Sequence, residues 1–137
     1  MNRPTIILAE DHADVADQLR QLLSEPFDVI AVVSHGEALL KAAARLKPDI
    51  VVLDISMPGM DGLSAAQELR NSQPSIGLVF VTVHDDRALA RKALGVGLGY
   101  VLKASAGEEL VDAVNAALTA RAFASAALGP LHTLMSD

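Results

Sequence analysis

Polar side chains suited to phosphate chemistry follow or close four apolar runs of this 137-residue chain. Among them, Asp54 carries a carboxylate that can act as a nucleophile toward a phosphoryl group. A lysine ammonium and a threonine hydroxyl can draw charge from phosphoryl oxygens or donate hydrogen bonds to them. We therefore predict that Asp54 becomes an aspartyl phosphate. The residues and their runs are Glu10 and Asp11 (run 5–10), Asp54 (50–53), Thr82 (78–83) and Lys103 (99–102).

The excess of acids among these residues predicts a cation. Carboxylates that lie close together repel one another unless one of them is protonated or a cation lies between them. The available ligands are the oxygens of Asp11 and Asp54 and a backbone carbonyl, which suit Mg²⁺. The chain has no cysteine, and its histidines are scattered along the sequence. We interpret all four histidines as solvated: His12, His35, His84 and His132.

The elements that must position these residues alternate along the chain. Apolar runs predict strands, and apolar residues at helical spacing predict a helix after each strand. Such alternation predicts an α/β fold with a mainly parallel sheet and helices on both faces. Because the carboxyl ends of parallel strands share one edge of a sheet, the polar residues above converge there. The predicted strands are 5–10, 28–33, 50–53, 78–83 and 99–102.

Helix boundaries follow from capping residues. Ser34 and Ser105 each precede a glutamate by three residues, which is the spacing of a capping box. Asp61 is placed to cap the third helix, and Asp85 or Asp86 the fourth. The fifth helix is expected to run through the Ala-rich segment toward Leu128. Gly129 and Pro130 then stop it, and a loose tail follows.

Composition excludes several classes of function. The net charge of −6 disfavours nucleic acid as a direct partner, because phosphate binding depends on basic patches. The apolar runs are far shorter than the roughly 20 residues of a membrane span, and the first run is too short for a signal peptide. We therefore expect no membrane partner and a reduced cytoplasmic environment.

Taken together, the motifs resemble the receiver domain of two-component response regulators over residues 4–122. The phrasing around Thr82 and Lys103 is most similar to receivers of the NarL/FixJ type, which belong to LuxR-family transcriptional regulators. The motifs are Glu10-Asp11, the run from Leu53 to Gly62, Thr82, and Tyr100 to Lys103. Two positions depart from the family pattern: Ala104 replaces a common proline, and Val83 is bulkier than the usual residue.

The resemblance implies a flavodoxin-like (βα)5 doubly wound sheet of strand order 2-1-3-4-5. It implies a receiver domain at 1–122, with 123–137 as the end of the fifth helix plus a tail or linker stub. It implies that a histidine kinase or phosphotransfer protein phosphorylates Asp54 and that Thr82 and Tyr100 switch conformation. The implied ligands of Mg²⁺ are Asp11, Asp54, the backbone carbonyl of Ser56 and, through water, Glu10; the implied phosphoryl-binding residues are Thr82 and Lys103.

The same resemblance implies a signalling phosphoacceptor rather than an enzyme, one that assists its own phosphorylation and dephosphorylation. Its output is expected to be transcription through a DNA-binding domain not present in this chain, with a possible homodimer on phosphorylation. Two alternatives stay open. One is a stand-alone or non-phosphorylated receiver-like interaction module, in which Asp54 and Lys103 form only a structural ion pair. The other is a haloacid-dehalogenase-like phosphatase, although Ser56 occupies the position where such enzymes need a second aspartate.

Overall fold

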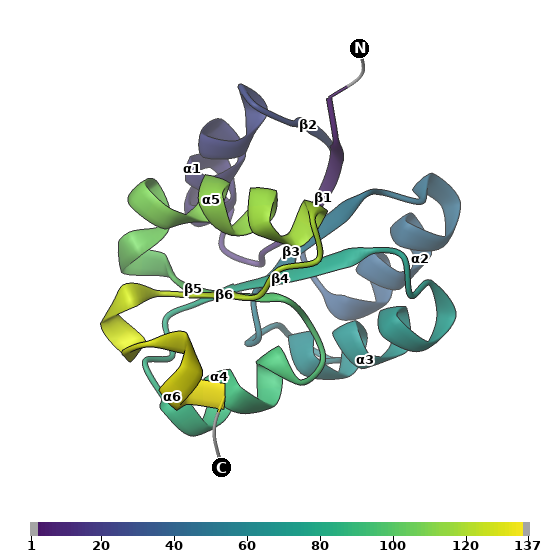
Figure 1. Cartoon of the computed structure of the whole chain (residues 1–137). Helices are drawn as coiled ribbons and strands as arrows, with labels where there is room; N and C mark the ends of the chain where they lie inside the picture. The colour runs from purple at the N-terminus through teal and green to yellow at the C-terminus, as the bar shows by residue number, and fades with distance from the viewer. Residues whose placement is uncertain (1–2, 136–137) are drawn as a thin grey trace.

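A computed structural model describes residues 3–135 as one parallel sheet with helices on both faces (Figure 1). The strand order is β2-β1-β3-β4-β5-β6, so the predicted order 2-1-3-4-5 is confirmed and a sixth strand is added at its end. The first two residues of the predicted domain and the last two of the predicted tail lie outside the described residues. The strands are β1 (Thr5–Ala9), β2 (Asp28–Val33), β3 (Ile50–Leu53), β4 (Gly77–Thr82), β5 (Gly99–Leu102) and β6 (Phe123–Ala124).

The helices cover the sheet in two layers. In Figure 1, α1 and α5 lie on one face, and α2, α3 and α4 lie on the other. None of the helices within residues 3–135 has the length and apolar character needed to cross a membrane. The helices are α1 (Ala13–Ser24), α2 (Gly36–Leu46), α3 (Gly62–Ser72), α4 (Arg87–Leu94), α5 (Ala106–Leu118) and α6 (Leu131–Met135), with 3-10 turns η1 (Lys103–Ser105) and η2 (Ala126–Leu128).

The central strand β3 is buried on both faces, as its apolar run predicts. Val51 and Leu53 belong to the core beneath α2, α3 and α4, whereas Ile50 and Val52 belong to the core beneath α1 and α5. Alternating side chains of one strand therefore enter two separate apolar layers. This packing fixes the register of β3 and with it the position of Asp54, the next residue in the chain.

Two of the predicted caps are confirmed and two are wrong. The side chain of Asp61 accepts from the Ser64 N–H, and that of Asp86 accepts from the first turn of α4. Helix α2 is capped by the His35 side chain, which accepts from the Ala38 N–H, and not by Ser34. Ser105 makes no side-chain cap, because the 3-10 turn η1 leads directly into α5.

The expectation of a long fifth helix is wrong. Helix α5 ends at Leu118, and the chain reverses through Ala120, whose φ of 57° is left-handed. The Arg121 N–H then donates to the Ala116 carbonyl, a bond that closes a helix end. Residues 123–124 pair with β5, and residues 131–135 form α6 where a loose tail was expected.

Candidate functional site

The predicted strand-end residues do converge at one edge of the sheet. Ala9 pairs with Leu53 in the register of β1 and β3, so Glu10 and Asp54 follow neighbouring strands at the same level. The Asp54 N–H donates to the Ala9 carbonyl at 3.1 Å, which continues the strand pairing by one more bond. Parallel pairing of β4 with β5 likewise sets Thr82 opposite Leu102, the residue before Lys103.

Lys103 joins two carboxylates at the centre of this edge. Its Nζ lies 2.7 Å from Asp54 Oδ2 and 2.7 Å from Glu10 Oε1. Burial lowers the pKa of the Lys103 ammonium, but hydrogen bonds to Asp54 and Glu10 and their negative charges outweigh burial, so the net pKa is raised above 10.5. Lys103 is therefore held in its charged form beside Asp54.

Asp54 is only 3% exposed, and the loop that follows it folds back tightly. Its Oδ1 accepts a hydrogen bond from the Ser56 N–H at 3.3 Å. The loop turns at Gly59, which has a φ of 75°, and the Gly62 N–H donates to the Ile55 carbonyl at 2.7 Å. A Cβ on Gly62 would lie 2.0 Å from the Asp54 carbonyl oxygen, so glycine is required where α3 begins.

Glu10, Asp11 and His12 bring three potential ligand atoms within 4.8 Å of one another. The Glu10 Oε1 atom is buried, and the Lys103 ammonium lies 2.7 Å from it. The carboxylates of Glu10, Asp11 and Asp54 are hard-oxygen donors, which fit Mg²⁺. The chemistry of these residues therefore agrees with a magnesium site; the roles of Asp11 and of the Ser56 carbonyl as ligands stay predictions.

The interpretation of the histidines as solvated missed contacts that two of them make at this edge. His12 is exposed, yet its Nδ1 lies 3.1 Å from Glu10 Oε2 and 3.2 Å from Asp11 Oδ1. His84 is half-buried, and its Nε2 lies 2.7 Å from the Ser56 hydroxyl. The only signal for His84 in the sequence was its position two residues beyond Thr82. Ser56 was predicted as a ligand through its backbone carbonyl, but the contact of its hydroxyl with His84 was not predicted.

Thr82 and Tyr100 meet at the same loop. The buried Thr82 hydroxyl accepts a hydrogen bond from the His84 N–H at 3.3 Å, and the Tyr100 hydroxyl donates to the His84 carbonyl at 2.7 Å. Tyr100 is 0% exposed. Burial, followed by the charges of Asp86, Asp54 and Asp85, raises the pKa of Tyr100 to about 12, so the phenol is neutral. Its ring is therefore already turned inward in this structure, with Thr82 bonded to its own loop.

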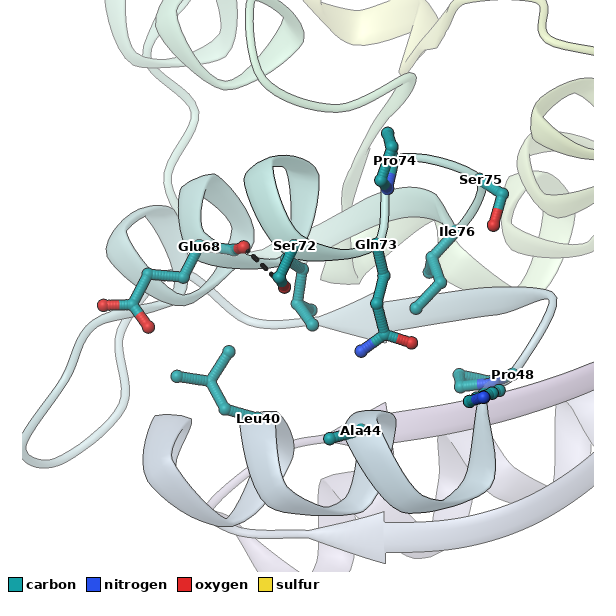
Figure 2. Close-up of a pocket in the computed structure, with 11 residues that line it drawn as sticks. Leu40, Ala44, Pro48, Glu68, Ser72, Gln73, Pro74, Ser75 and Ile76 are labelled. Atoms are coloured by element: carbon teal, nitrogen blue, oxygen red, sulfur yellow. Dashed lines mark hydrogen bonds between the residues drawn. The ribbon is translucent and has the colours of Figure 1, made fainter.

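A pocket with a volume of about 670 Å³ lies away from these residues. Figure 2 shows Leu40 and Ala44 of α2 opposite Glu68 and Ser72 of α3, where the Ser72 hydroxyl donates to the Glu68 carbonyl. The loops that close this pocket precede β3 and β4, so they lie at the edge of the sheet opposite to Asp54. The pocket contains none of the predicted site residues.

Comparisons with known proteins place most of the chain within one family. Residues 6–115 match the family model of the response regulator receiver domain. The response regulator GacA of Pseudomonas aeruginosa is 35% identical over 113 residues, which cover 80% of this chain and 53% of GacA. The nitrate/nitrite response regulator NarL of Escherichia coli K12 is 35% identical over 130 residues, which cover 93% of this chain and 60% of NarL. The chain thus spans between half and two thirds of the length of these relatives.

Solved structures give the same result. A LuxR-family two-component response regulator from Aurantimonas superposes with a TM-score of 0.89 at 28% identity, over 98% of this chain and 96% of that one. The isolated REC domain of RcsB from Salmonella enterica, determined with the phosphomimetic BeF3⁻, superposes with a TM-score of 0.86 at 25% identity. The superposition covers 98% of this chain and 100% of that one. A further structure contains two RcsB dimers bound to two parallel DNAs; it has a TM-score of 0.85 at 25% identity and covers 98% of this chain and 68% of that one.

Proposed function

This chain belongs to the response regulator receiver domain family, and from that premise we propose that it is a phosphoacceptor switch in which Asp54 receives the phosphoryl group. The observation that carries the proposal is the Lys103 ammonium, 2.7 Å from Asp54 Oδ2 at the carboxyl end of β3. Asp54 is thus a buried carboxylate beside a cation, a position that it shares with Glu10. The surrounding groups stabilise additional negative charge on Asp54, which a phosphoryl group brings.

The transfer forms a bond between an Asp54 carboxylate oxygen and phosphorus. The bond between phosphorus and a kinase or phosphotransfer-protein histidine breaks, and the released imidazole takes up a proton. Lys103 then pairs with a phosphoryl oxygen, and the Thr82 hydroxyl donates to another. Mg²⁺, held by Asp11, Asp54, the Ser56 carbonyl and, through water, Glu10, would neutralise phosphoryl charge.

The proposed conformational switch involves Thr82, His84 and Tyr100. If the Thr82 hydroxyl turns to the phosphoryl group, the loop loses the bond from the His84 N–H to that hydroxyl. His84 also accepts from Tyr100 and contacts Ser56, so its displacement reaches both neighbours. Phosphorylation thus shifts the balance between two packings of this loop. Because Tyr100 is already buried, the change we propose concerns its hydroxyl bond and not a rotation of its ring from solvent.

The partners follow from the family. We propose a histidine kinase or phosphotransfer protein as phosphoryl donor, and a cytoplasmic location, where such donors act. RcsB has been solved as dimers on DNA, and we propose by analogy that phosphorylation promotes a homodimer of this chain. Contact with DNA would be made through an output domain outside these 137 residues, in keeping with their net charge of −6.

The alternatives give different predictions for the same residues. A dehalogenase-like phosphatase needs an acid at position 56, but Ser56 directs its hydroxyl to His84. A module that is never phosphorylated would keep Lys103 and Asp54 only as an ion pair. The phosphatase alternative predicts turnover of phosphate esters. The alternative of a module that is never phosphorylated predicts no labelling of Asp54.

The test is incubation with acetyl phosphate and Mg²⁺, followed by intact mass spectrometry. We expect the mass of one phosphoryl group to be added, to be lost in hydroxylamine, and to be absent without Mg²⁺. The matched control is Asp54→Asn, which preserves size but removes the nucleophile. An adduct that survives hydroxylamine, or one that forms equally on Asp54→Asn, contradicts the proposal.

A further inference from the structure

The segment 123–135, which we call the C-terminal strap, docks on the surface formed by α4, β5 and α5. Its strand β6 pairs with β5, setting Phe123 beside Gly99 and Ala124 beside Tyr100. In Figure 1 the strap, in yellow, runs along β5 and ends with α6 against α4. Leu128 and Leu134 of the strap are buried. The strap is therefore a packed element of the fold.

Two arginines of α4 hold the far end of the strap. Arg87 donates to the Leu128 carbonyl and lies 3.5 Å from the Thr133 hydroxyl. The Arg91 Nε donates to the Leu134 carbonyl at 2.9 Å. Charged donors to carbonyl groups make stronger bonds than neutral donors do. These contacts lie outside the strand pairing and can be removed singly from an exposed face of α4.

Ser125 holds the near end and is completely buried. Its hydroxyl accepts from the Leu102 N–H at 2.8 Å and donates to the Glu109 carboxylate of α5. Its own N–H donates to the Tyr100 carbonyl at 2.9 Å. Ser125 is thus bonded to the backbone on both sides of Val101 in β5. Because its hydroxyl has both a donor and an acceptor partner, few other side chains could replace it.

These bonds connect the strap to the phosphoacceptor site by two short routes. Leu102 directly precedes Lys103, whose ammonium pairs with Asp54. Tyr100 donates to the His84 carbonyl, and the His84 N–H donates to Thr82. The first route passes from Ser125 through Leu102 to Lys103. The second passes from Ser125 through Tyr100 and His84 to Thr82.

We propose that the docked strap and the Lys103–Asp54 ion pair stabilise each other, with Ser125 as the positioning residue between them. The strap fixes the end of β5, so Lys103 leaves the strand in a direction that reaches Asp54. The ion pair, in return, anchors the 3-10 turn that starts at Lys103 and keeps the Leu102 N–H facing Ser125. Such coupling is reciprocal by thermodynamic necessity.

A consequence rests on the proposed function. A phosphoryl group on Asp54 replaces the resting pair, because Lys103 must turn from the carboxylate to a phosphoryl oxygen. The strap then loses part of its support and loosens. Phosphorylation would in this way reach the C-terminal end of the chain by a route that runs through β5.

The first test weakens the strap and observes the site. In Arg87→Ala we expect amide hydrogen exchange at Phe123 and Ser125 to be roughly tenfold faster, as for loss of one charge-assisted hydrogen bond. The reaction of Lys103 with an amine-labelling reagent should rise as well, while that of Lys41 stays constant. Lys92→Ala, which removes an exposed cation from the same helix, is the control and should change neither. Faster exchange with unchanged Lys103 labelling overturns the coupling.

The second test works in reverse. Lys103→Met removes the ion pair without touching the strap, and we expect exchange at Phe123 and Ser125 to speed up by a larger factor than exchange at the amides of α2. Unaltered strap exchange in a folded Lys103→Met protein overturns the coupling. If Ser125→Ala folds, it should show both effects together, more labelling of Lys103 and faster exchange of the strap; a change in only one of them counts against its positioning role.

A third measurement separates this inference from the proposed function. Beryllofluoride with Mg²⁺ should raise the melting temperature and at the same time speed exchange in the strap. Binding without faster strap exchange overturns the link to phosphorylation. Absence of binding overturns the proposed function instead, and the two variant tests still decide whether strap and ion pair are coupled.

Discussion

Lys103 holds two buried carboxylates together, Asp54 and Glu10, at a position where their charges would otherwise repel. Removing one partner of such a group leaves uncompensated buried charge, which costs more than the ion pair itself contributes. The arrangement is stable only while a cation is present. We propose that this site accepts the lysine, a divalent ion or both, which is the property that the proposed phosphoacceptor role needs.

Lys103→Met should therefore destabilise the chain and make it depend on magnesium. We expect a loss of about 1–3 kcal/mol in the free energy of unfolding without metal, because Glu10 and Asp54 lose their shared cation. Added Mg²⁺ should raise the melting temperature of this variant more than that of the unaltered chain. Lys41→Met, on the exposed face of α2, is the control for loss of a lysine. Equal melting temperatures for the two variants, with equal responses to Mg²⁺, would refute the assignment.

Tyr100 gives a prediction for alkaline pH. Its pKa is raised to about 12 in the folded chain against 10.0 for an ordinary tyrosine, mainly by burial. Below pH 10 the phenol of Tyr100 is protonated in both the folded and the unfolded chain, so its full contribution to the free energy of unfolding is present. As the pH rises from 10 toward 12, only the unfolded chain releases this proton, and the folded chain becomes less stable. Between about pH 9 and 11 the unaltered chain should lose about 1 kcal/mol more than Tyr100→Phe does. Urea unfolding at the two pH values measures this, and parallel losses in the two proteins would contradict it.

Among individual residues, the sequence predicted the positions of side chains that directly follow strands. It did not predict side-chain contacts that depend on the paths of loops. Asp54, Glu10, Thr82 and Lys103 come together because parallel strands end at one edge, which the strand pattern alone predicts. The bond between His84 and Ser56 joins two loops. Its formation depends on how each loop turns, and no periodicity in the sequence encodes that.

Among the elements, the loop from β3 to α3 is the most tightly constrained. A methyl group on Gly62 would overlap the Asp54 backbone, so the start of α3 or the end of β3 must shift. Gly62→Ala should lower the free energy of unfolding by about 1–3 kcal/mol or more, as overpacking does, and should also slow phosphorylation of Asp54. Urea unfolding and acetyl phosphate labelling measure the two effects.

The control is Gly107→Ala in α5, where an added Cβ has no neighbour within 4 Å. Its backbone is helical, so alanine should leave stability unchanged or raise it by about 0.4–1 kcal/mol. If Gly62→Ala proved as stable as Gly107→Ala, the loop would be less constrained than the structure indicates.

The elements that sequence reasoning misjudged lie at the C-terminal end. The segment 120–127 is rich in alanine, which favours helix. In the structure, tertiary contacts outweigh this preference: Ala120 takes a left-handed φ without being glycine, and residues 123–124 gain strand pairing along β5. The strap forms because β5 offers a free edge and α4 offers two arginines. Neither is visible from the local sequence, whereas the five earlier strands each had their own apolar run.

For the molecule as a whole, the sheet separates two tasks. Its two apolar layers hold the strands in register, and Glu10, Asp54 and Lys103 meet at its carboxyl edge. The order 2-1-3-4-5 was implied by resemblance to a family, and the match over residues 6–115 confirms that family. The sixth strand extends the order beyond what the resemblance implied.

The central claim is that one carboxylate, Asp54, accepts the phosphoryl group. The most direct measurement treats the chain with acetyl phosphate and Mg²⁺, reduces any acyl phosphate with borohydride, and locates the modified residue by peptide mass spectrometry. We predict modification at Asp54 alone, dependent on Mg²⁺. Modification of another acid such as Asp11 or Glu10, or none at Asp54 under conditions where Mg²⁺ binds, would contradict it.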